Sequence, residues 1–159
     1  MCQEINIMRI TISAIAKIKA GPEAQMIEDY NKRNPWDVAI KQDEVRKNLT
    51  GEALQLAEAE LIEKHIPEGA TVIALDERGK EFTSRSFAGK LESYQDTGVR
   101  DVCFIIGGAD GLHARLKSRS DLMIHFGRMT WPHKLVRVML SEQLYRAAMI
   151  LKGHPYHRD

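Results

Sequence analysis

The stretch DVCFIIGGADGL, residues 101–112, decides the fold class of this 159-residue protein. After Asp101 it is continuously apolar as far as Ile106, which is typical of a strand buried on both faces of a parallel sheet. Gly107, Gly108 and Gly111 follow within five residues and would let the backbone approach a ligand closely. A tight strand-to-helix connection without a ligand is an equally good interpretation of these glycines.

Outward from this stretch, β-rich and helix-favouring segments alternate along the chain. We expect strands over 8–16, 36–41, 71–75, 101–106 and 122–126. We expect helices over 22–32, 47–65, 84–95, 112–118 and 134–152, the third of them capped by Thr83 or Ser84. The polar residues 76–80 are expected to form a loop. The alternation predicts one α/β domain over 1–159, with a mostly parallel sheet flanked by helices and a loose N-terminal extension over 1–7.

Composition points to a water-soluble, cytoplasmic protein without membrane contact. Hydrophobic residues make up 43% and charged residues 28% of the chain, and no apolar run reaches the length of a membrane-spanning helix. No signal peptide is expected, because an acidic residue stands early and no cleavage site follows. Cys2 and Cys103 are too few for a disulfide framework, and Cys103 is expected to be a small buried hydrophobic residue in a reducing compartment.

Positive charge is concentrated in the last third of the chain. Residues 113–159 hold nine Lys and Arg against three Asp and Glu, a net charge of +6, whereas residues 1–112 carry −5. Such asymmetry indicates an end that faces a polyanion, although solvated helix faces would explain it equally simply.

The common catalytic and cofactor motifs are absent. The glycines fit neither GxGxxG nor GxxxxGK[ST], and no GxSxG elbow is present. His125, His133, His154 and His157 match no metal-ligand spacing, so no metal is expected. Cys103, inside a strand, is a poor candidate nucleophile.

The last helix and the tail are the remaining candidates for function. Residues 134–152 are apolar on more than one face, which indicates either a subunit interface or a central core helix. The tail HPYHRD, residues 154–159, contains Tyr, His and Arg, which can stack on a base and bind phosphate. A solvated tail is the alternative.

Three segments together resemble a known family. TVIALDERGK (71–80), IIGGADGL (105–112) and WPHKLVRVMLSEQLYRAAMILKGHPYHRD (131–159) are similar to the H-type methyltransferases that modify N3 of a pseudouridine in large-subunit ribosomal RNA, within the SPOUT superfamily. The similarity covers nearly the whole chain and is weakest over 34–68. Ala16 stands where the family leads us to expect a glycine, a departure that concerns the fold more than the site.

The resemblance implies a SPOUT-type fold with a deep trefoil knot near the C-terminus. It also implies that S-adenosylmethionine (SAM) binds among three loops, with no metal. The cofactor-binding residues carried over are Leu75, Gly107, Gly108, Gly127, Arg128, Met129, Thr130, Trp131 and Pro132. Glycines in these loops would admit the cofactor, and Leu75, Met129 and Trp131 would form apolar walls around it.

The resemblance further implies a homodimer with the site at the subunit interface. The implied substrate is a pseudouridine of 23S rRNA helix 69 on the assembled 70S ribosome. Three tail residues are expected to be catalytic. His157 is expected to be the general base or an orienting group, and Arg158 the cation that stabilises the developing imide anion. Tyr156 is expected to position the target nucleobase. Arg137 and Arg146 are expected to hold phosphate or the dimer interface.

Two other functions are weighed against this one. A non-enzymatic ribosome-binding factor on the same fold would tolerate a spoiled cofactor pocket, but Gly107, Gly108 and the HPYHR tail are intact. A SPOUT methyltransferase acting on tRNA is less consistent with so short a chain and with this tail.

Overall fold

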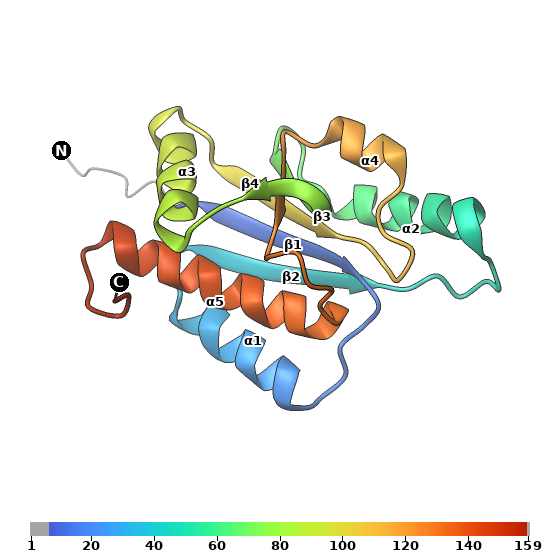
Figure 1. The fold of residues 1–159 in the computed structure, drawn as a ribbon, viewed down its shortest axis with the longest axis horizontal. Helices are drawn as coiled ribbons and strands as arrows, with labels where there is room; N and C mark the ends of the chain where they lie inside the picture. The colour runs from blue at the N-terminus through green and yellow to red at the C-terminus, as the bar shows by residue number, and fades with distance from the viewer. Residues whose placement is uncertain (1–6, 159) are drawn as a thin grey trace.

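All strands described in the computed structural model, which covers residues 7–158, form one parallel sheet with the order β2-β1-β4-β3-β5 (Figure 1). The strands are β1 (Arg9–Ile15), β2 (Asp37–Asp43), β3 (Thr71–Glu81), β4 (Asp101–Ile106) and β5 (Leu122–His125). The helices are α1 (Pro22–Arg33), α2 (Gly51–His65), α3 (Ser84–Asp96), α4 (Ala114–Arg119) and α5 (His133–Leu151). The expected α/β class with a mostly parallel sheet is therefore confirmed. Apart from Ile7, the predicted N-terminal extension lies outside the described residues, as does Cys2.

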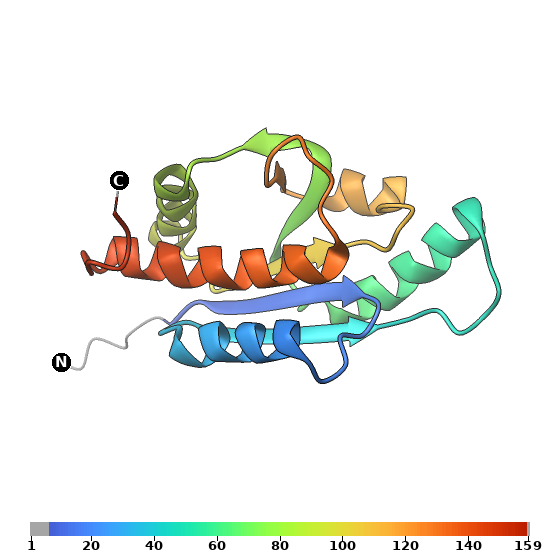
Figure 2. The same ribbon diagram turned by 60° about the horizontal axis from the view of Figure 1, so that its bottom comes forward.

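Helices cover both faces of the sheet, which explains the continuous apolar run in β4. Phe104 belongs to the core shared with α3 and α5, whereas Cys103 and Ile105 belong to the core shared with α2 and α4 (Figure 2). Cys103 is fully buried, as expected, and burial raises the pKa of its thiol to about 12. Within the described residues, no helix is long and apolar enough to cross a bilayer.

The predicted loop over residues 76–80 is wrong. β3 continues through these polar residues to Glu81, because Lys80 and Glu81 pair with Ile124 and His125 of β5 after a register shift. Gly79 makes this close pairing possible: a Cβ there would lie 2.5 Å from the backbone N of Ile124. Residues 76–81 stay extended because the backbone on both sides of the register shift pairs with β5, and polar side chains give no sign of such pairing.

Two helix starts differ from their predicted positions, by four residues in α2 and by two in α4. α2 begins at Gly51 rather than at residue 47, and the positive φ of Gly51 (58°) breaks its continuity with the preceding segment. α4 begins at Ala114 rather than 112, because the His113 side chain accepts a hydrogen bond from the N–H of Arg115 and caps the helix. Thr83 is the cap of α3, in a capping box with Ser86. The other predicted ends agree with the structure to within two residues.

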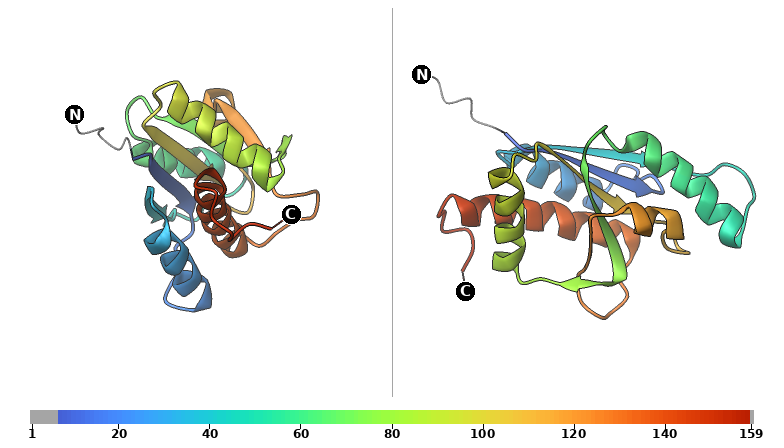
Figure 3. Two further views of the ribbon diagram at one scale, coloured as in Figure 1. Left: turned by 90° about the vertical axis from the view of Figure 1, so that its left-hand side faces the viewer. Right: turned by 90° about the horizontal axis from the view of Figure 1, so that it is seen from above.

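α5 is a central core helix in this chain. It packs between α1 and α3 (Figure 3), and nine of its residues are buried. These buried residues account for most of the apolar character that the sequence shows, although Leu135 stays exposed on the surface.

Arg137 fastens α5 to the sheet. Its side chain is 0% exposed, so the expectation that it holds phosphate or a dimer interface is wrong. One terminal nitrogen donates to Ala16 O and Gln42 Oε1, both at 2.6 Å, and the other donates to Ile15 O. Burial lowers the pKa of Arg137 to about 10. The start of α5 is thereby fixed to the carboxyl ends of β1 and β2.

Candidate active site at the carboxyl ends of the strands

A cavity of about 350 Å³ opens at the carboxyl ends of β4 and β5, beside the middle of β3. Its walls come from Leu75 to Glu77 in β3, from the glycine loop after β4, and from the segment 126–131 after β5. Ligands in open parallel sheets bind at this edge, and a volume of this size suits a small organic molecule.

The structure brings together eight of the nine residues expected to bind the cofactor. Leu75, Gly107, Gly108, Gly127, Arg128, Met129, Thr130 and Trp131 all line the cavity. Pro132 is not among its lining residues; it precedes α5 as the N-cap residue. Their proximity agrees with the expected role, but the role itself stays a prediction.

The segment after β5 is held by a few local contacts. Gly127 has a left-handed φ of 104°, and its N–H donates to Nδ1 of His125 at 3.0 Å. Trp131 Nε1 donates to Phe126 O at 3.2 Å, which folds the segment back on itself. Met129 remains 78% exposed at the rim, so an apolar side chain is available to cover a ligand.

The glycines after β4 are required by the loop itself. A Cβ on Gly107 would lie 2.8 Å from the backbone C of Gly111, and a Cβ on Gly108 would lie 2.6 Å from Oε1 of Glu58. Gly111 N donates to Gly108 O at 3.0 Å, which closes the turn. The tight connection and the ligand-facing loop are therefore one and the same structure.

Sequence reasoning missed a charged pair on the cavity wall. Asp76 Oδ2 and Lys117 Nζ are 3.0 Å apart, and the Asp76 side chain is only 8% exposed. Burial acts to raise the pKa of Asp76, but hydrogen bonds from the Arg78 N–H and from Lys117 bring it below its ordinary value. The signal available in the sequence is that Asp76 directly follows the apolar strand 71–75. The polar character of residues 76–80 predicts a loop there instead.

The cavity fits the chemistry of SAM. Leu75, Ile106, Leu112 and Val136 provide apolar wall for an adenine, and the glycine loop provides closely approaching backbone. The Asp76 and Glu77 carboxyl groups are acceptors on the same wall, and such acceptors suit a ligand that carries an ammonium and a sulfonium charge.

The three tail residues lie away from this cavity. Tyr156 Oη donates to Oε1 of Glu142 at 3.0 Å, and the Tyr156 ring packs edge-on against Tyr145. Arg146 binds Glu142 and lies 3.0 Å from Nδ1 of His157. Burial and the Glu142 carboxylate raise the pKa of Tyr156. The solvated-tail alternative is therefore wrong for Tyr156 and His157.

Arg158 is exposed, and none of Tyr156, His157 and Arg158 lines the cavity. Arg146, expected to hold phosphate or the dimer interface, is engaged within its own chain.

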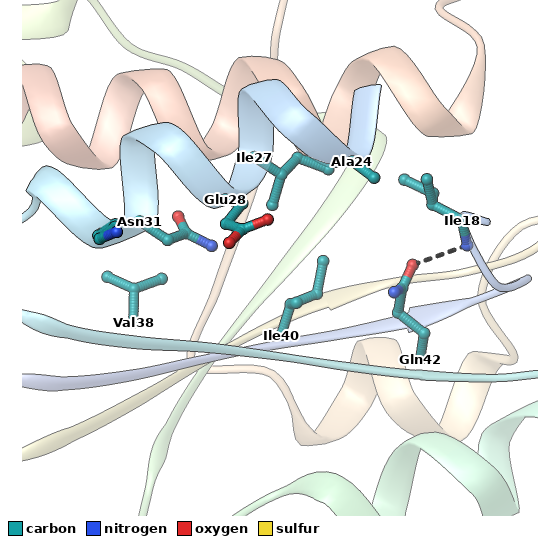
Figure 4. A pocket seen from close by; sticks show the side chains of 9 residues that line it. Ile18, Ala24, Ile27, Glu28, Asn31, Val38, Ile40 and Gln42 are labelled. Atoms are coloured by element: carbon teal, nitrogen blue, oxygen red, sulfur yellow. Dashed lines mark hydrogen bonds between the residues drawn. The ribbon is translucent and has the colours of Figure 1, made fainter. Parts of the chain in front are cut away.

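Two further hollows differ from the cavity in chemistry. One, of about 470 Å³, lies among α1, α3 and α5 and is bordered by Glu142 and by residues 124–127. The other, of about 450 Å³, lies between α1 and the edge strand β2 and is lined mainly by the aliphatic Ile18, Ile27, Val38 and Ile40 (Figure 4). It has no glycine loop. In the described part of the chain, no three His, Cys, Asp or Glu side chains are grouped to hold a metal.

Comparison with known proteins identifies the family. A family model described as "Predicted SPOUT methyltransferase" matches residues 8–157. The chain belongs to the SPOUT methyltransferase family.

Within this family, curated relatives are similar over nearly the whole chain. "Ribosomal RNA large subunit methyltransferase H" of Paramagnetospirillum magneticum is 49% identical over 95% of this chain and 99% of its own length. The protein of the same name from Rhodospirillum centenum is 46% identical over the same shares. A solved structure, a probable methyltransferase from Bordetella pertussis, is 15% identical, covers 90% of this chain and 98% of its own, and has a TM-score of 0.56, which supports the fold.

Proposed function

We propose that this SPOUT family member transfers a methyl group from SAM to N3 of a pseudouridine in helix 69 of 23S rRNA, on the assembled 70S ribosome. The observation that carries the proposal is the convergence of Leu75, the glycine loop and the 127–131 segment on one cavity. The relatives named as large-subunit rRNA methyltransferases, 46–49% identical, support the substrate class.

Leu75, Gly107, Gly108 and the segment 127–132 would hold the cofactor, and the exposed Met129 and Trp131 would exclude water from the reacting atoms. When bound, SAM supplies a methyl group that is already activated on a sulfonium. The remaining work of the protein is to align the nucleophilic nitrogen and to help its imide proton leave.

The contacts of the tail refine the roles proposed for its residues. A guanidinium can only donate, so Nδ1 of His157 is the acceptor in its 3.0 Å contact with Arg146. His157 would act as the base that takes up the N3 proton once the tail reaches the substrate, or as an orienting group. Tyr156, held by Glu142, would position the pseudouridine, and the exposed Arg158 would stabilise the developing imide anion.

We infer that the working enzyme is a cytoplasmic homodimer in which the tail of one copy serves the cavity of the other. Tyr156 contacts Glu142, which lies six residues along α5 from Val136 in the cavity wall, a distance of about 9 Å along the helix axis. Transfer requires reacting atoms about 3–3.5 Å apart. Exposed apolar side chains on α1 (Met26) and α5 (Leu135) are available for a subunit contact.

The trefoil knot expected for the family is part of the same proposal. It would involve the segment that follows β5 and leads into α5, while β5 itself lies close to β3, where a Cβ on Gly79 would meet the backbone of Ile124. A knot would fix the three loops around the cofactor without further contacts. Resistance of the purified protein to unfolding by pulling on its two ends, with a shortened final extension, would test it.

The activity is tested by transfer of labelled methyl from SAM to 70S ribosomes from cells that lack this protein. We expect label on one pseudouridine of 23S rRNA, mapped by RNA mass spectrometry, and none on ribosomes from cells that contain the protein. Arg158→Ala should lower the rate roughly a hundredfold. Arg100→Ala, at the opposite, amino end of the strands, is the matched control and should keep the wild-type rate.

The two alternatives give different results in this assay. No binding of SAM would favour a non-enzymatic ribosome-binding factor. Binding of SAM without label on ribosomes would reject the ribosomal substrate, and tRNA would be tested next.

Sharing of the site between copies is tested by mixing two inactive variants. Arg158→Ala lacks the tail cation and Trp131→Ala lacks a cavity wall, so a mixed dimer would contain one intact composite site. Co-refolding equal amounts should restore roughly a quarter of the wild-type activity, because half of the dimers are mixed and each has one working site. A mixture no more active than its components would show that each chain uses its own tail.

A further inference from the structure

Helix α2 contacts the glycine loop after β4 through the buried acid Glu58. Glu58 is 7% exposed although it carries a carboxyl group, and a buried carboxyl without a cationic partner is unusual in a folded protein. Its carboxylate accepts a hydrogen bond from the backbone N–H of Gly108, while its Oε2 has no partner. The burial of Glu58 is therefore coupled to one backbone atom of the glycine loop.

A second side chain of α2 supports the same loop. Gln55 Nε2 donates to Asp110 O at 2.6 Å, so α2 contacts the loop at Gly108 and again two residues later. Gln55 and Glu58 are three residues apart, so both side chains lie on the same side of the helix. The loop between β4 and α4 is thus held by two residues of α2 that are not among those lining the cavity.

We propose that Glu58 is a positioning residue for the methyl-transfer site: it fixes the peptide N–H of Gly108 away from the cavity and so sets the backbone that receives the cofactor. This inference rests on the proposed function for its consequence, but the contact itself does not depend on any ligand. It also assigns a reason to Gly108, because a Cβ there would lie 2.6 Å from Oε1 of Glu58. A side chain at position 108 would therefore displace the Glu58 carboxylate from its place against the loop.

The proposal separates hydrogen bonding from charge. A glutamine at position 58 keeps an oxygen that can accept from Gly108, whereas an alanine removes the acceptor and leaves a buried N–H without a partner. Burial, and to a smaller extent the charge of Asp110, raises the pKa of Glu58, which the Gly108 N–H opposes. A glutamine is neutral, so it avoids the free-energy cost of burying a charged carboxylate. It is therefore a conservative replacement for Glu58.

The test measures SAM binding by calorimetry and methyl transfer to ribosomes for wild type, Glu58→Gln and Glu58→Ala. We expect Glu58→Ala to weaken SAM binding roughly tenfold, the loss of one hydrogen bond to a charged group. Glu58→Gln should stay within about threefold of wild type, the usual spread of such measurements. Glu60→Ala, an exposed acid on the same helix, is the matched control and should match wild type. In Glu58→Ala the maximal rate with saturating SAM should be nearly restored.

A second measurement does not depend on SAM. The amide proton of Gly108 should resonate downfield in wild type and Glu58→Gln and move upfield in Glu58→Ala, with faster hydrogen exchange. Absence of SAM binding by wild type, together with the expected Gly108 shifts, would overturn the proposed function but not the contact. Equal SAM binding by all variants would overturn the inference. So would a Gly108 amide proton whose chemical shift and exchange rate are the same in Glu58→Ala as in wild type.

Discussion

Ala16 lies in a backbone conformation that suits glycine, and replacing it should stabilise the protein. Its φ is 71°, and it is the one non-glycine residue with positive φ among residues 7–158. Two hydrogen bonds hold it there, from Ala16 N to Asp43 O at 2.8 Å and from Arg137 to Ala16 O at 2.6 Å. The backbone therefore cannot relax, and the strain persists in the folded state.

The magnitude follows from two opposing contributions. A left-handed conformation costs an L-residue roughly 1–2 kcal/mol relative to glycine. Glycine gives back roughly 0.4–1 kcal/mol, because it loosens the unfolded chain. Since the Ala16 side chain is exposed and adds no core packing, Ala16→Gly should raise the free energy of unfolding by about 0.8 kcal/mol. The melting temperature should rise by about 2–3 °C for a chain of this size.

The assay is urea unfolding followed by circular dichroism at one fixed protein concentration, so that any self-association affects all variants equally. Ala20→Gly is the control, because Ala20 is also exposed but does not have positive φ. This control should lose roughly 0.4–1 kcal/mol. If Ala16→Gly were destabilised as much as Ala20→Gly, the claim of backbone strain at Ala16 would be refuted.

Other features of the fold make further predictions. Arg137→Met should lower the free energy of unfolding by about 3 kcal/mol in the same urea assay, because the buried Ile15 O and the partly buried Ala16 O lose the Arg137 donor and Gln42 Oε1 loses one of its two donors, whereas the exposed Lys134→Met should change it little. Thr83→Ala, which removes the capping box of α3, should cost about 1 kcal/mol. At pH 8, in a Cys2→Ser variant, Cys103 should react with a thiol reagent only as fast as the protein unfolds. Because burial raises the pKa of Cys103 from 9.0 to about 12, its contribution to stability should fall as pH rises above about 9, where only the unfolded thiol ionises. The fall should be absent in a Cys103→Ala variant, and equal pH profiles of the two proteins between pH 9 and 10 would contradict the burial.

The parts of the fold that depend on side-chain burial could be predicted from sequence. β4 can be predicted because Cys103 and Phe104 are buried on opposite faces of the sheet. Its sequence is therefore apolar at every position after Asp101. The second half of β3 is invisible for the opposite reason. Lys80 and Glu81 are held by backbone pairing with β5, and their polar side chains are typical of a loop.

The same distinction divides the candidate site. Clustered glycines indicate the loop after β4, because the backbone of Gly111 excludes a Cβ at Gly107 and a Cβ at Gly108 would displace Glu58. The residues that support the loop could not be found in this way. Glu58 lies on α2 at a position that looks like any other acid of an amphipathic helix, and only the folded chain shows that it is buried.

The two halves of the proposed site are held by different kinds of contact, and this difference bears on how the enzyme works. The cavity is built from backbone that is fixed by glycines, by α2 and by Arg137, so it can keep its shape without a ligand. The tail is held by a side-chain network in which Glu142 is shared by Tyr156 and Arg146. These contacts join side chains rather than backbone groups, so contacts with RNA can replace them without a change of fold. A rigid cofactor cavity and an exchangeable tail would allow SAM to bind first and the tail to reorganise only when ribosomal RNA arrives.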